Sequence, residues 1–285
     1  MDIKVHSRYE DGDFIYNHIT KKNQSKDEYV PHFHDIYELI FVKSGEVSYI
    51  VDGRKYALNK NSLVITRPGD VHCIVVENGE SDYERYNILF DEKILSHPIL
   101  ERMPKSTHVM DFNASGTVTS IFSKMEYYCK NLSGSDLKHI LKSLTEEVIL
   151  NILIELSPTS AQNYTELDST MQRAVRYIDE NLLAISGIED ICNNIYVTKS
   201  HLHHLFTKYL KITPKRYIMA KRLAIARREI YMGAKVTEVF ARCGFSDYSA
   251  FFRAYKNHFG VAPSRIDEKD SLSTVNGDLR HRYNT

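Results

Sequence analysis

The chain is short of long apolar runs, glycine and proline, and each shortage excludes a class of protein. No apolar run among its 285 residues approaches the roughly 20 residues that a membrane-spanning helix needs. The charged start, residues 1–6, also lacks the apolar segment of a secretory signal peptide. We therefore expect a cytoplasmic protein without a membrane partner. With only 12 glycines and 7 prolines, the chain is long enough for two packed domains.

Cysteine is equally scarce. The four cysteines lie at positions 73, 129, 192 and 243, without the paired spacing of a disulfide framework or of a cysteine zinc site. We expect each of them to be a small core residue.

The chain as a whole has no net charge, but its two halves carry net charges of opposite sign. The 37 basic and 37 acidic residues cancel. Residues 197–266 nevertheless carry 14 basic against 3 acidic side chains, a net charge of +11, whereas residues 1–164 carry 18 against 24, a net charge of −6. Such a basic region is the usual electrostatic footprint of phosphate contacts. The alternative is a helical bundle with ordinary surface lysines.

Two similar helix-turn-helix patterns lie within the basic region. A short helix begins near Ile188, and after a turn Thr198 caps a second helix whose apolar residues share one side. The same helix-turn-helix pattern recurs further along the chain, and Asp247 is expected to cap the second helix of this second pattern. Gly244 suits the turn before it, because glycine adopts positive φ without steric cost.

A longer helix joins the two patterns. It is expected to begin at Pro214 and to end near Met232, where Gly233 stops it. A helix of about nineteen residues spans on the order of 28 Å. The two second helices could then lie about 34 Å apart, which is one turn of DNA. One chain could therefore contact two successive major grooves.

Many spaced positions of this region match one known pattern. The matching positions are 198–206, 214, 222–227, 241–249, 251, 253, 255–256 and 260–264. They resemble the DNA-binding domain of the AraC/XylS family of transcription regulators. The resemblance implies an all-α double helix-turn-helix domain over residues 165–268 that binds double-stranded DNA. One departure is Lys211, which stands where the family usually has glycine.

The resemblance also assigns residues to the DNA contact. Those matching base-contacting positions are Ser200, His203 and His204 in the first unit and Tyr248, Ser249 and Arg253 in the second. Arginine can bond a guanine edge through two hydrogen bonds, while histidine and serine can donate or accept one. Those expected to contact the phosphate backbone are Lys199, Lys208 and Lys256. The alternative for each is an exposed helix residue without a DNA contact.

The N-terminal half follows a period of two that is typical of strands. Candidate strands cover residues 37–42, 46–51, 54–58, 62–66, 72–77 and 84–90. Asp52–Gly53 between two apolar runs is a strong hairpin signal, and many short strands indicate a small jelly-roll barrel. Residues 1–30 are expected to form an extended arm with short strands, and residues 94–112 a connector. We assign residues 1–112 to this sensor domain.

Four residues of the barrel region form a possible ligand cluster: His32, His34, Glu38 and His72. Alternate residues of an extended chain point to the same side, so the first three could converge. The pattern is similar to the two cupin motifs, in which three histidines and one glutamate hold a metal. AraC-type regulators with cupin sensor domains keep a similar pattern around a small-molecule pocket. We therefore predict an effector pocket, with no metal and no cofactor.

Two apolar helix faces follow within residues 113–160. One runs from Val118 to Tyr128, and the longer one runs from Leu137 to Leu156. The longer helix is apolar enough to serve two surfaces, so we expect a homodimer through this region. A polar stretch at 157–163 is the expected domain boundary, and the tail 269–285 is expected to be disordered.

The predicted chain is thus of the α+β class: a cupin-like β-barrel, dimerisation helices and an all-α DNA-binding domain. We expect a sequence-specific transcription regulator rather than an enzyme. It is expected to be an activator that responds to a small molecule, such as a sugar or related metabolite, bound in the barrel. Its partners would be operator or promoter DNA, the effector, a second copy and RNA polymerase.

Two alternatives remain open at this point. One is a cupin metalloenzyme that uses His32, His34, Glu38 and His72 with an accessory basic domain. The other is a regulator whose barrel binds nothing and serves only for dimerisation.

Overall fold

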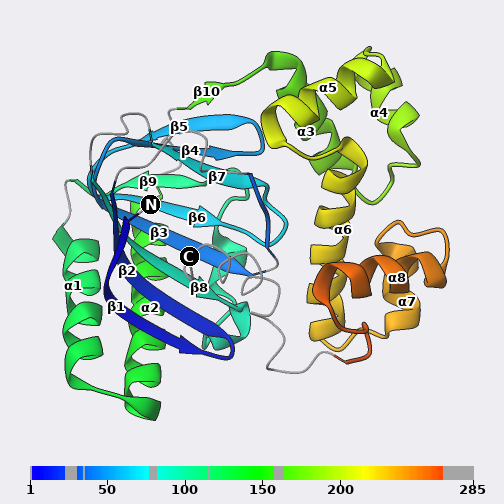
Figure 1. Cartoon of the computed structure of the whole chain (residues 1–285). Coiled ribbons are helices and arrows are strands. Elements are labelled where there is room, and N and C mark those ends of the chain that lie inside the picture. Colours follow the sequence, from blue (N-terminus) through cyan, green and yellow to red (C-terminus); the bar gives the residue numbers. More distant parts are fainter. Residues whose placement is uncertain are drawn as a thin grey trace.

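The computed structural model describes residues 2–22, 31–34, 36–76, 82–113, 116–156 and 164–265. A β-barrel forms the N-terminal half, with two helices along one side and the C-terminal helices on the other (Figure 1). Within these residues, no helix combines the length and the apolar character needed to cross a membrane.

Two antiparallel sheets build the barrel. The six-stranded sheet has the order β1-β2-β8-β3-β6-β9, and the four-stranded sheet has the order β10-β5-β4-β7. The strands are β1 (Asp2–Asp11), β2 (Phe14–Lys22), β3 (Tyr37–Ser44), β4 (Val47–Val51), β5 (Arg54–Leu58), β6 (Ser62–Thr66), β7 (His72–Val76), β8 (Tyr83–Phe90), β9 (Val109–Asp111) and β10 (Thr165–Glu166). All six strands predicted between residues 37 and 90 are confirmed, with ends shifted by at most two residues.

Two sequence-based expectations for the barrel are wrong. Residues 2–22 form no arm, because β2 lies between β1 and β8 and is buried from Phe14 to Lys21. Its side chains are buried on both sides of the sheet, which an exposed arm would not allow. Residues 94–112 are more than a connector, since β9 pairs with β6 after the short 3-10 helices η2 (Glu92–Ile94) and η3 (Ile99–Arg102).

The helices α1 (Gly116–Asn131) and α2 (Gly134–Glu155) cover the six-stranded sheet, as the apolar faces predicted. Stacking of Phe122 on Phe41, with ring centroids 4.7 Å apart, joins α1 to β3. The buried residues of α2 are Leu137, Leu141, Leu144, Thr145, Val148, Ile149 and Ile152. On its outer side Leu150 and Ile154 are 43% and 77% exposed, so α2 has a second apolar surface. The expected boundary at 157–163 and the tail 269–285 lie outside the described residues.

Six helices form the C-terminal half: α3 (Ser169–Asn181), α4 (Ile188–Ile195), α5 (Lys199–Leu210), α6 (Pro214–Tyr231), α7 (Val236–Arg242) and α8 (Tyr248–Phe259). Both predicted caps are confirmed: Thr198 accepts from the His201 amide at 3.1 Å, and Asp247 accepts from the Ala250 amide at 2.7 Å. Lys211 ends α5 at φ 55°, the left-handed conformation that explains a glycine at this position in the family. No disulfide joins the four cysteines; Cys73, Cys192 and Cys243 are buried as expected, whereas Cys129 is only half-buried.

The helix α6 belongs to two hydrophobic cores. Tyr217 and Ile218 pack with α3, α4 and α5, while Leu223 and Ala226 pack with α7 and α8. Figure 1 shows α6 running between these two groups of helices. A displacement of α6 therefore affects both helix-turn-helix units.

The barrel contacts these helices through two tight turns. At Gly53 a Cβ would come within 2.8 Å of the Gln172 side chain of α3, and at Gly69 it would come within 3.3 Å of the Lys221 Cα of α6. Both glycines have positive φ, 77° and 84°. β10, which pairs with β5, adds a third contact close to α3. The sensor and the helical half are thus directly docked.

Candidate functional site

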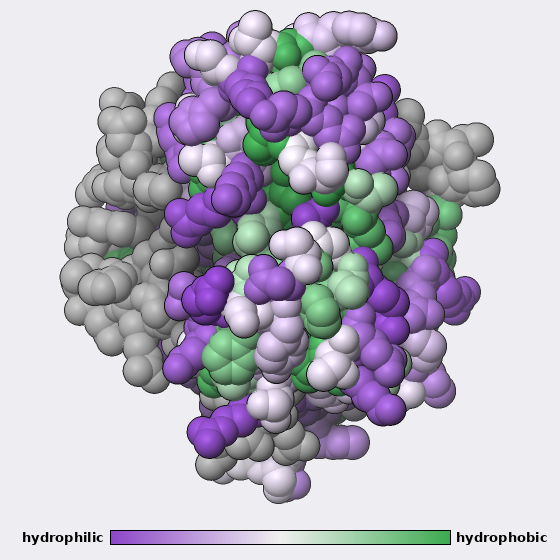
Figure 2. All heavy atoms as spheres, turned by 90° about the vertical axis from the view of Figure 1, so that its right-hand side faces the viewer, coloured by the Kyte–Doolittle hydropathy of each residue, from purple (hydrophilic) through white to green (hydrophobic). Residues whose placement is uncertain are grey.

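The helices α5 and α8 expose all nine candidate DNA-contacting residues. Those on α5 are Lys199, Ser200, His203, His204 and Lys208, and those on α8 are Tyr248, Ser249, Arg253 and Lys256. The view onto the helical half shows many hydrophilic side chains, with apolar side chains between them (Figure 2). The N-terminal end of a helix also carries a partial positive charge, which favours phosphate oxygens.

Burial on one side of each helix explains this exposure. Leu202, Leu205 and Phe206 are fully buried on α5, so the histidines between them point outward. On α8 the residues Phe251 and Tyr255 are buried, so Arg253 and Lys256 point outward in the same way. The apolar spacing thus determines which side chains are free to meet DNA.

Some of the candidates already have partners in the chain. Lys199 forms an ion pair with Glu189 of α4, and the ammonium of Lys208 lies 4.7 Å from the Tyr209 ring centroid. By contrast, Arg253 has neither an ion pair nor a hydrogen bond within the described part of the chain. Its guanidinium is therefore available for a ligand.

The net charge of residues 197–266 overstates the charge available for DNA. Arg222 donates to the backbone oxygens of Leu182, Ile185 and Gly244, at 2.6 to 3.0 Å, and so ties the two helix-turn-helix units together. Its guanidinium also explains Gly244, where a Cβ would lie 2.7 Å from the Arg222 Cζ. Counting charges along the sequence could not distinguish such inward residues.

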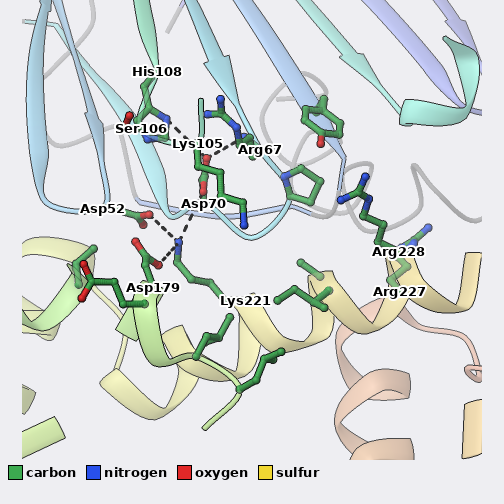
Figure 3. A pocket seen from close by; sticks show the side chains of 18 of the residues that line it. Asp52, Arg67, Asp70, Lys105, Ser106, His108, Asp179, Lys221, Arg227 and Arg228 are labelled. Carbon is green, nitrogen blue, oxygen red and sulfur yellow. Dashed lines mark hydrogen bonds and ion pairs between the residues drawn. The ribbon is translucent and has the colours of Figure 1, made fainter. Parts of the chain in front are cut away.

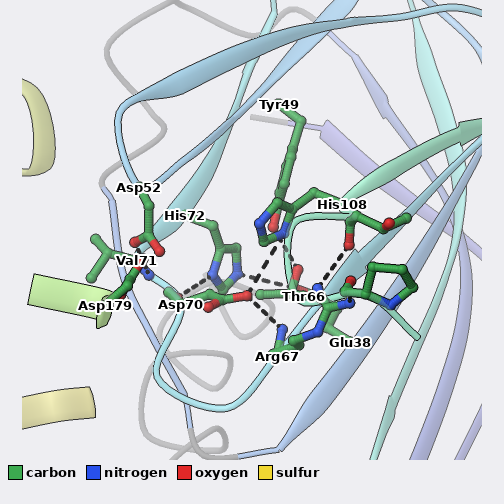
Figure 4. Close-up of polar contacts among 12 residues, drawn as sticks. Glu38, Tyr49, Asp52, Thr66, Arg67, Asp70, Val71, His72, His108 and Asp179 are labelled. Atoms are coloured by element: carbon green, nitrogen blue, oxygen red, sulfur yellow. Dashed lines mark hydrogen bonds and ion pairs between the residues drawn. The ribbon is translucent and has the colours of Figure 1, made fainter. Parts of the chain in front are cut away.

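The four residues of the predicted effector pocket are brought together inside the barrel. His34 Nε2 and His72 Nε2 lie 3.3 and 3.1 Å from the same oxygen of Glu38. His32 pairs with His72 through two backbone hydrogen bonds of 3.0 and 2.8 Å. Figure 4 shows His72, Glu38 and the neighbouring loop residue Asp70. Three of the four side chains are buried, and His32 is half-buried.

The orientation of the two rings determines what this cluster can bind. Nδ1 of His34 faces the Ile36 carbonyl at 2.8 Å and Nδ1 of His72 faces the Asp70 carbonyl at 2.9 Å, so each Nδ1 donates. Both Nε2 atoms are thereby directed at Glu38. Burial alone would raise the pKa of Glu38, but the hydrogen bonds and charges of the two histidines hold it well below its usual range.

The cluster has the chemistry of a ligand or metal site. The ligand atoms of His32, His34 and His72 all lie within 4.8 Å of one another. Imidazoles held by backbone carbonyls are common zinc ligands, and the same groups can bind a polar ligand through hydrogen bonds.

A second site lies between the barrel and the helices. A cavity of about 940 Å³ is bounded by barrel loops on one side and by α3 and α6 on the other (Figure 3). None of the four residues of the predicted effector pocket lines it. Sequence reasoning missed this site, because its walls come from segments far apart in the chain.

Lys221 links the two walls of the cavity. Its Nζ lies 2.8 Å from Asp52, 3.1 Å from Asp179 and 3.8 Å from Asp70. Burial alone would lower the pKa of Lys221, but these carboxylates hold it well above its usual value. Asp70 also carries the backbone oxygen that binds His72, so one loop contacts both sites.

Comparison with solved structures gives distant likenesses over most of the chain. ToxT from Vibrio cholerae O395 is 14% identical, with a TM-score of 0.39, covering 94% of this chain and 100% of that one. The AraC-like transcriptional activator CuxR is 16% identical, with a TM-score of 0.38, covering 85% of each chain. Both TM-scores are too low to support a functional argument.

Family and sequence comparisons are more informative. A family model described as an AraC-like ligand binding domain matches residues 20–125, and one described as a helix-turn-helix domain matches residues 191–269. The uncharacterized HTH-type transcriptional regulator YbfI of Bacillus subtilis is 26% identical, covering 76% of this chain and 79% of the relative. The transcriptional activator RhaS of Yersinia pestis is 22% identical, covering 81% and 86%. The chain therefore belongs to the AraC family of transcriptional regulators, with an N-terminal ligand-binding domain and a C-terminal helix-turn-helix DNA-binding domain.

Proposed function

We propose that this regulator reads its operator through α5 and α8, with one helix in each of two successive major grooves. The base-reading residues are Ser200, His203, His204, Tyr248, Ser249 and Arg253. Lys199, Lys208 and Lys256 bind the phosphate backbone. The observation that carries this proposal is that all nine side chains are exposed on two capped helices whose opposite sides are buried.

We further propose that the protein is an activator that responds to a small molecule. The activator role is supported by the similarity to RhaS, which is described as an activator. Residues 1–112 form the sensor domain, and His32, His34, Glu38 and His72 bind the effector in its barrel. The buried cluster with converging nitrogen and oxygen atoms supports this assignment. RNA polymerase is the expected partner of an activator.

We also propose that the protein forms a homodimer. Residues 113–160 pair two copies through the outer side of α2, where Leu150 and Ile154 are exposed. Residues 165–268 form the DNA-binding domain. Ligand binding in the sensor would shift the population of docked arrangements, because the barrel touches α3 and α6 directly.

Fluorescence anisotropy with an operator selected from random DNA tests the assignment of readers. Arg253→Ala should weaken binding to the operator by about tenfold or more and binding to random DNA far less, because a bidentate base contact contributes about 1–3 kcal/mol. Lys256→Ala should weaken both equally and reduce the salt dependence. Lys124→Ala on α1, far from both helices in sequence, serves as the matched control and should change neither. If Arg253→Ala weakens binding to operator and to random DNA equally, Arg253 contacts the phosphate backbone and not a base.

A further inference from the structure

The cavity between the barrel and the helices has the dimensions of a ligand site. Its volume of about 940 Å³ is at the upper end of the range of roughly 300–1,000 Å³ that is typical of small-molecule pockets. Barrel residues such as Arg67 and Lys105 form one wall, and helix residues such as Arg176 and Lys221 form the other. A molecule bound there would touch both domains.

Most carboxylates of the cavity are already paired. Asp52, Asp70 and Asp179 surround Lys221, and Glu92 accepts from Arg228 at 2.9 Å. Lys221 and Arg228 are therefore already engaged by carboxylates and are not available to a ligand. Asp91 and Glu180 also line the cavity, so an anion must bind through the other lining cations.

Three of the cavity cations that form no ion pair with a carboxylate of the described residues are Arg67, Lys105 and Arg176. Arg67 donates to the backbone oxygens of Thr107 and Pro104, at 2.7 and 2.8 Å, which fixes its guanidinium in place. Lys105 and Arg176 are exposed and form neither an ion pair nor a hydrogen bond with any described residue. Because Arg67 and Lys105 belong to the barrel and Arg176 to α3, positive charge lies on both sides of the cavity.

The remaining lining suits hydroxyl groups and an aliphatic face. Ser106 and Glu180 offer hydrogen-bonding atoms, while Tyr37, Pro68 and Ile225 offer apolar surface. A small molecule with one acidic group, several hydroxyls and a carbon skeleton matches all three kinds of lining.

We propose that this interdomain cavity binds a small polyhydroxylated organic anion, a sugar acid or a sugar phosphate, at a site separate from the histidine cluster in the barrel. The anionic group lies among Arg67, Lys105 and Arg176. Bound there, it replaces repulsion between cations of the two domains by attraction and stabilises their docked arrangement. The regulatory role of this site rests on the proposed function, whereas the binding itself does not.

Thermal unfolding and calorimetric titration of the full chain test the site with glucuronate, glucose 6-phosphate and uncharged glucose as probes. At least one of the two anions should raise the melting temperature with increasing concentration, and glucose at the same concentration should not. Binding of glucuronate alone identifies a sugar acid, and binding of glucose 6-phosphate alone identifies a sugar phosphate. Lys105→Ala and Arg176→Ala should each lower the affinity for the anion by about tenfold, since each removes a charged hydrogen-bond donor. Lys60→Ala, an exposed barrel lysine outside the cavity lining, should leave binding unchanged.

Two results would overturn the proposal. One is that neither anion binds at about a thousandfold excess over protein, where a site of even modest affinity would show stabilisation. The other is unchanged binding in both Lys105→Ala and Arg176→Ala, which would place the anion elsewhere, such as on α5 and α8. DNA affinity is measured separately without anion. If DNA binding fails while the anion binds as described, the proposed function fails and the site stands.

Discussion

The Nζ atom of Lys221 lies 2.8 Å from a carboxylate oxygen of Asp52, a residue 169 positions earlier in the chain. This contact ties α6, which packs in both helix-turn-helix cores, to the hairpin turn of the sensor barrel. A buried cation therefore joins the two functional halves of the molecule, in addition to the contacts at Gly53 and Gly69.

Replacing Lys221 by methionine should destabilise the protein by about 3–5 kcal/mol, because the buried carboxylates of Asp52 and Asp70 lose their counter-charge. Urea unfolding followed by circular dichroism measures this loss. Lys124→Met, at an exposed position of α1, is the matched control and should stay within about 0.5 kcal/mol of the wild type.

A second substitution separates charge from packing at this contact. Asp52→Asn in the Lys221→Met background should recover part of the lost stability by removing one unpaired charge. Asparagine tolerates the positive φ of 46° at position 52, so the turn should remain intact. A cost below about 1 kcal/mol for Lys221→Met alone would show that the ion cluster does not hold the domains together.

Glycine at position 69 is predicted to be essential for the docking of α6. Gly69→Ala should cost about 1–3 kcal/mol, because an added Cβ meets the Ala224 Cβ at 3.2 Å and the φ of 84° is strained. Gly12→Ala is a suitable comparison, since Gly12 also has positive φ but has no atom within 4 Å of an added Cβ. Equal costs for the two variants in thermal unfolding would rule out a steric contact between the loop and the helix.

Acid should weaken the docked structure through His108, which lines the cavity. Burial, with a further contribution from Arg67, lowers the pKa of His108 to about 3, although an Asp70 oxygen lies 3.8 Å away. The unfolded chain takes up a proton at this residue below about pH 6.5, whereas the folded chain does so only near pH 3. The free energy of unfolding therefore decreases as the pH is lowered from about 6.5 to about 3.

The matched variant for this effect is His108→Gln. Between pH 7 and pH 5 it should lose about 2 kcal/mol less than the wild type, since the one titrating group at this position is gone. Urea unfolding at the two pH values gives the comparison. The same acid sensitivity in both proteins would show that other groups cause it.

The local patterns of the sequence predicted much of this fold, for reasons visible in particular residues. Thr198 and Asp247 cap their helices as expected, because capping depends only on the following turn of chain. The hairpin at Asp52–Gly53 and the strands with alternating apolar residues could also be predicted, because they depend on neighbouring residues of the chain. The resemblance to the AraC family then supplied the nine candidate DNA-contacting residues of α5 and α8, and all nine are exposed.

Features that depend on distant segments could not be predicted. The N-terminal strands appeared as an arm because nothing local shows that β2 pairs with β8. Lys221 contributes to the net charge counted for residues 197–266, although three carboxylates from separate segments surround it. The interdomain cavity has no sequence signal for the same reason.

The proposed dimer predicts that α2 is sensitive to charge on its outer side. Ile154→Glu should convert a dimer into a monomer in size-exclusion chromatography with light scattering, because a charge on an apolar interface must be desolvated. Ser135→Glu places the same charge at an exposed position at the other end of α2 and should not change the mass. A monomeric wild type at the concentrations used would contradict dimerisation through this helix.

The most direct test of the account is the footprint of one chain on its selected operator. Two reading helices on one chain predict two protected half-sites about 10–10.5 base pairs apart on the same face of the DNA. Arg253→Ala should abolish protection of one half-site while the other is retained, since α5 is untouched. A single half-site per chain, or loss of both half-sites together with unchanged binding to random DNA, would contradict reading by both α5 and α8.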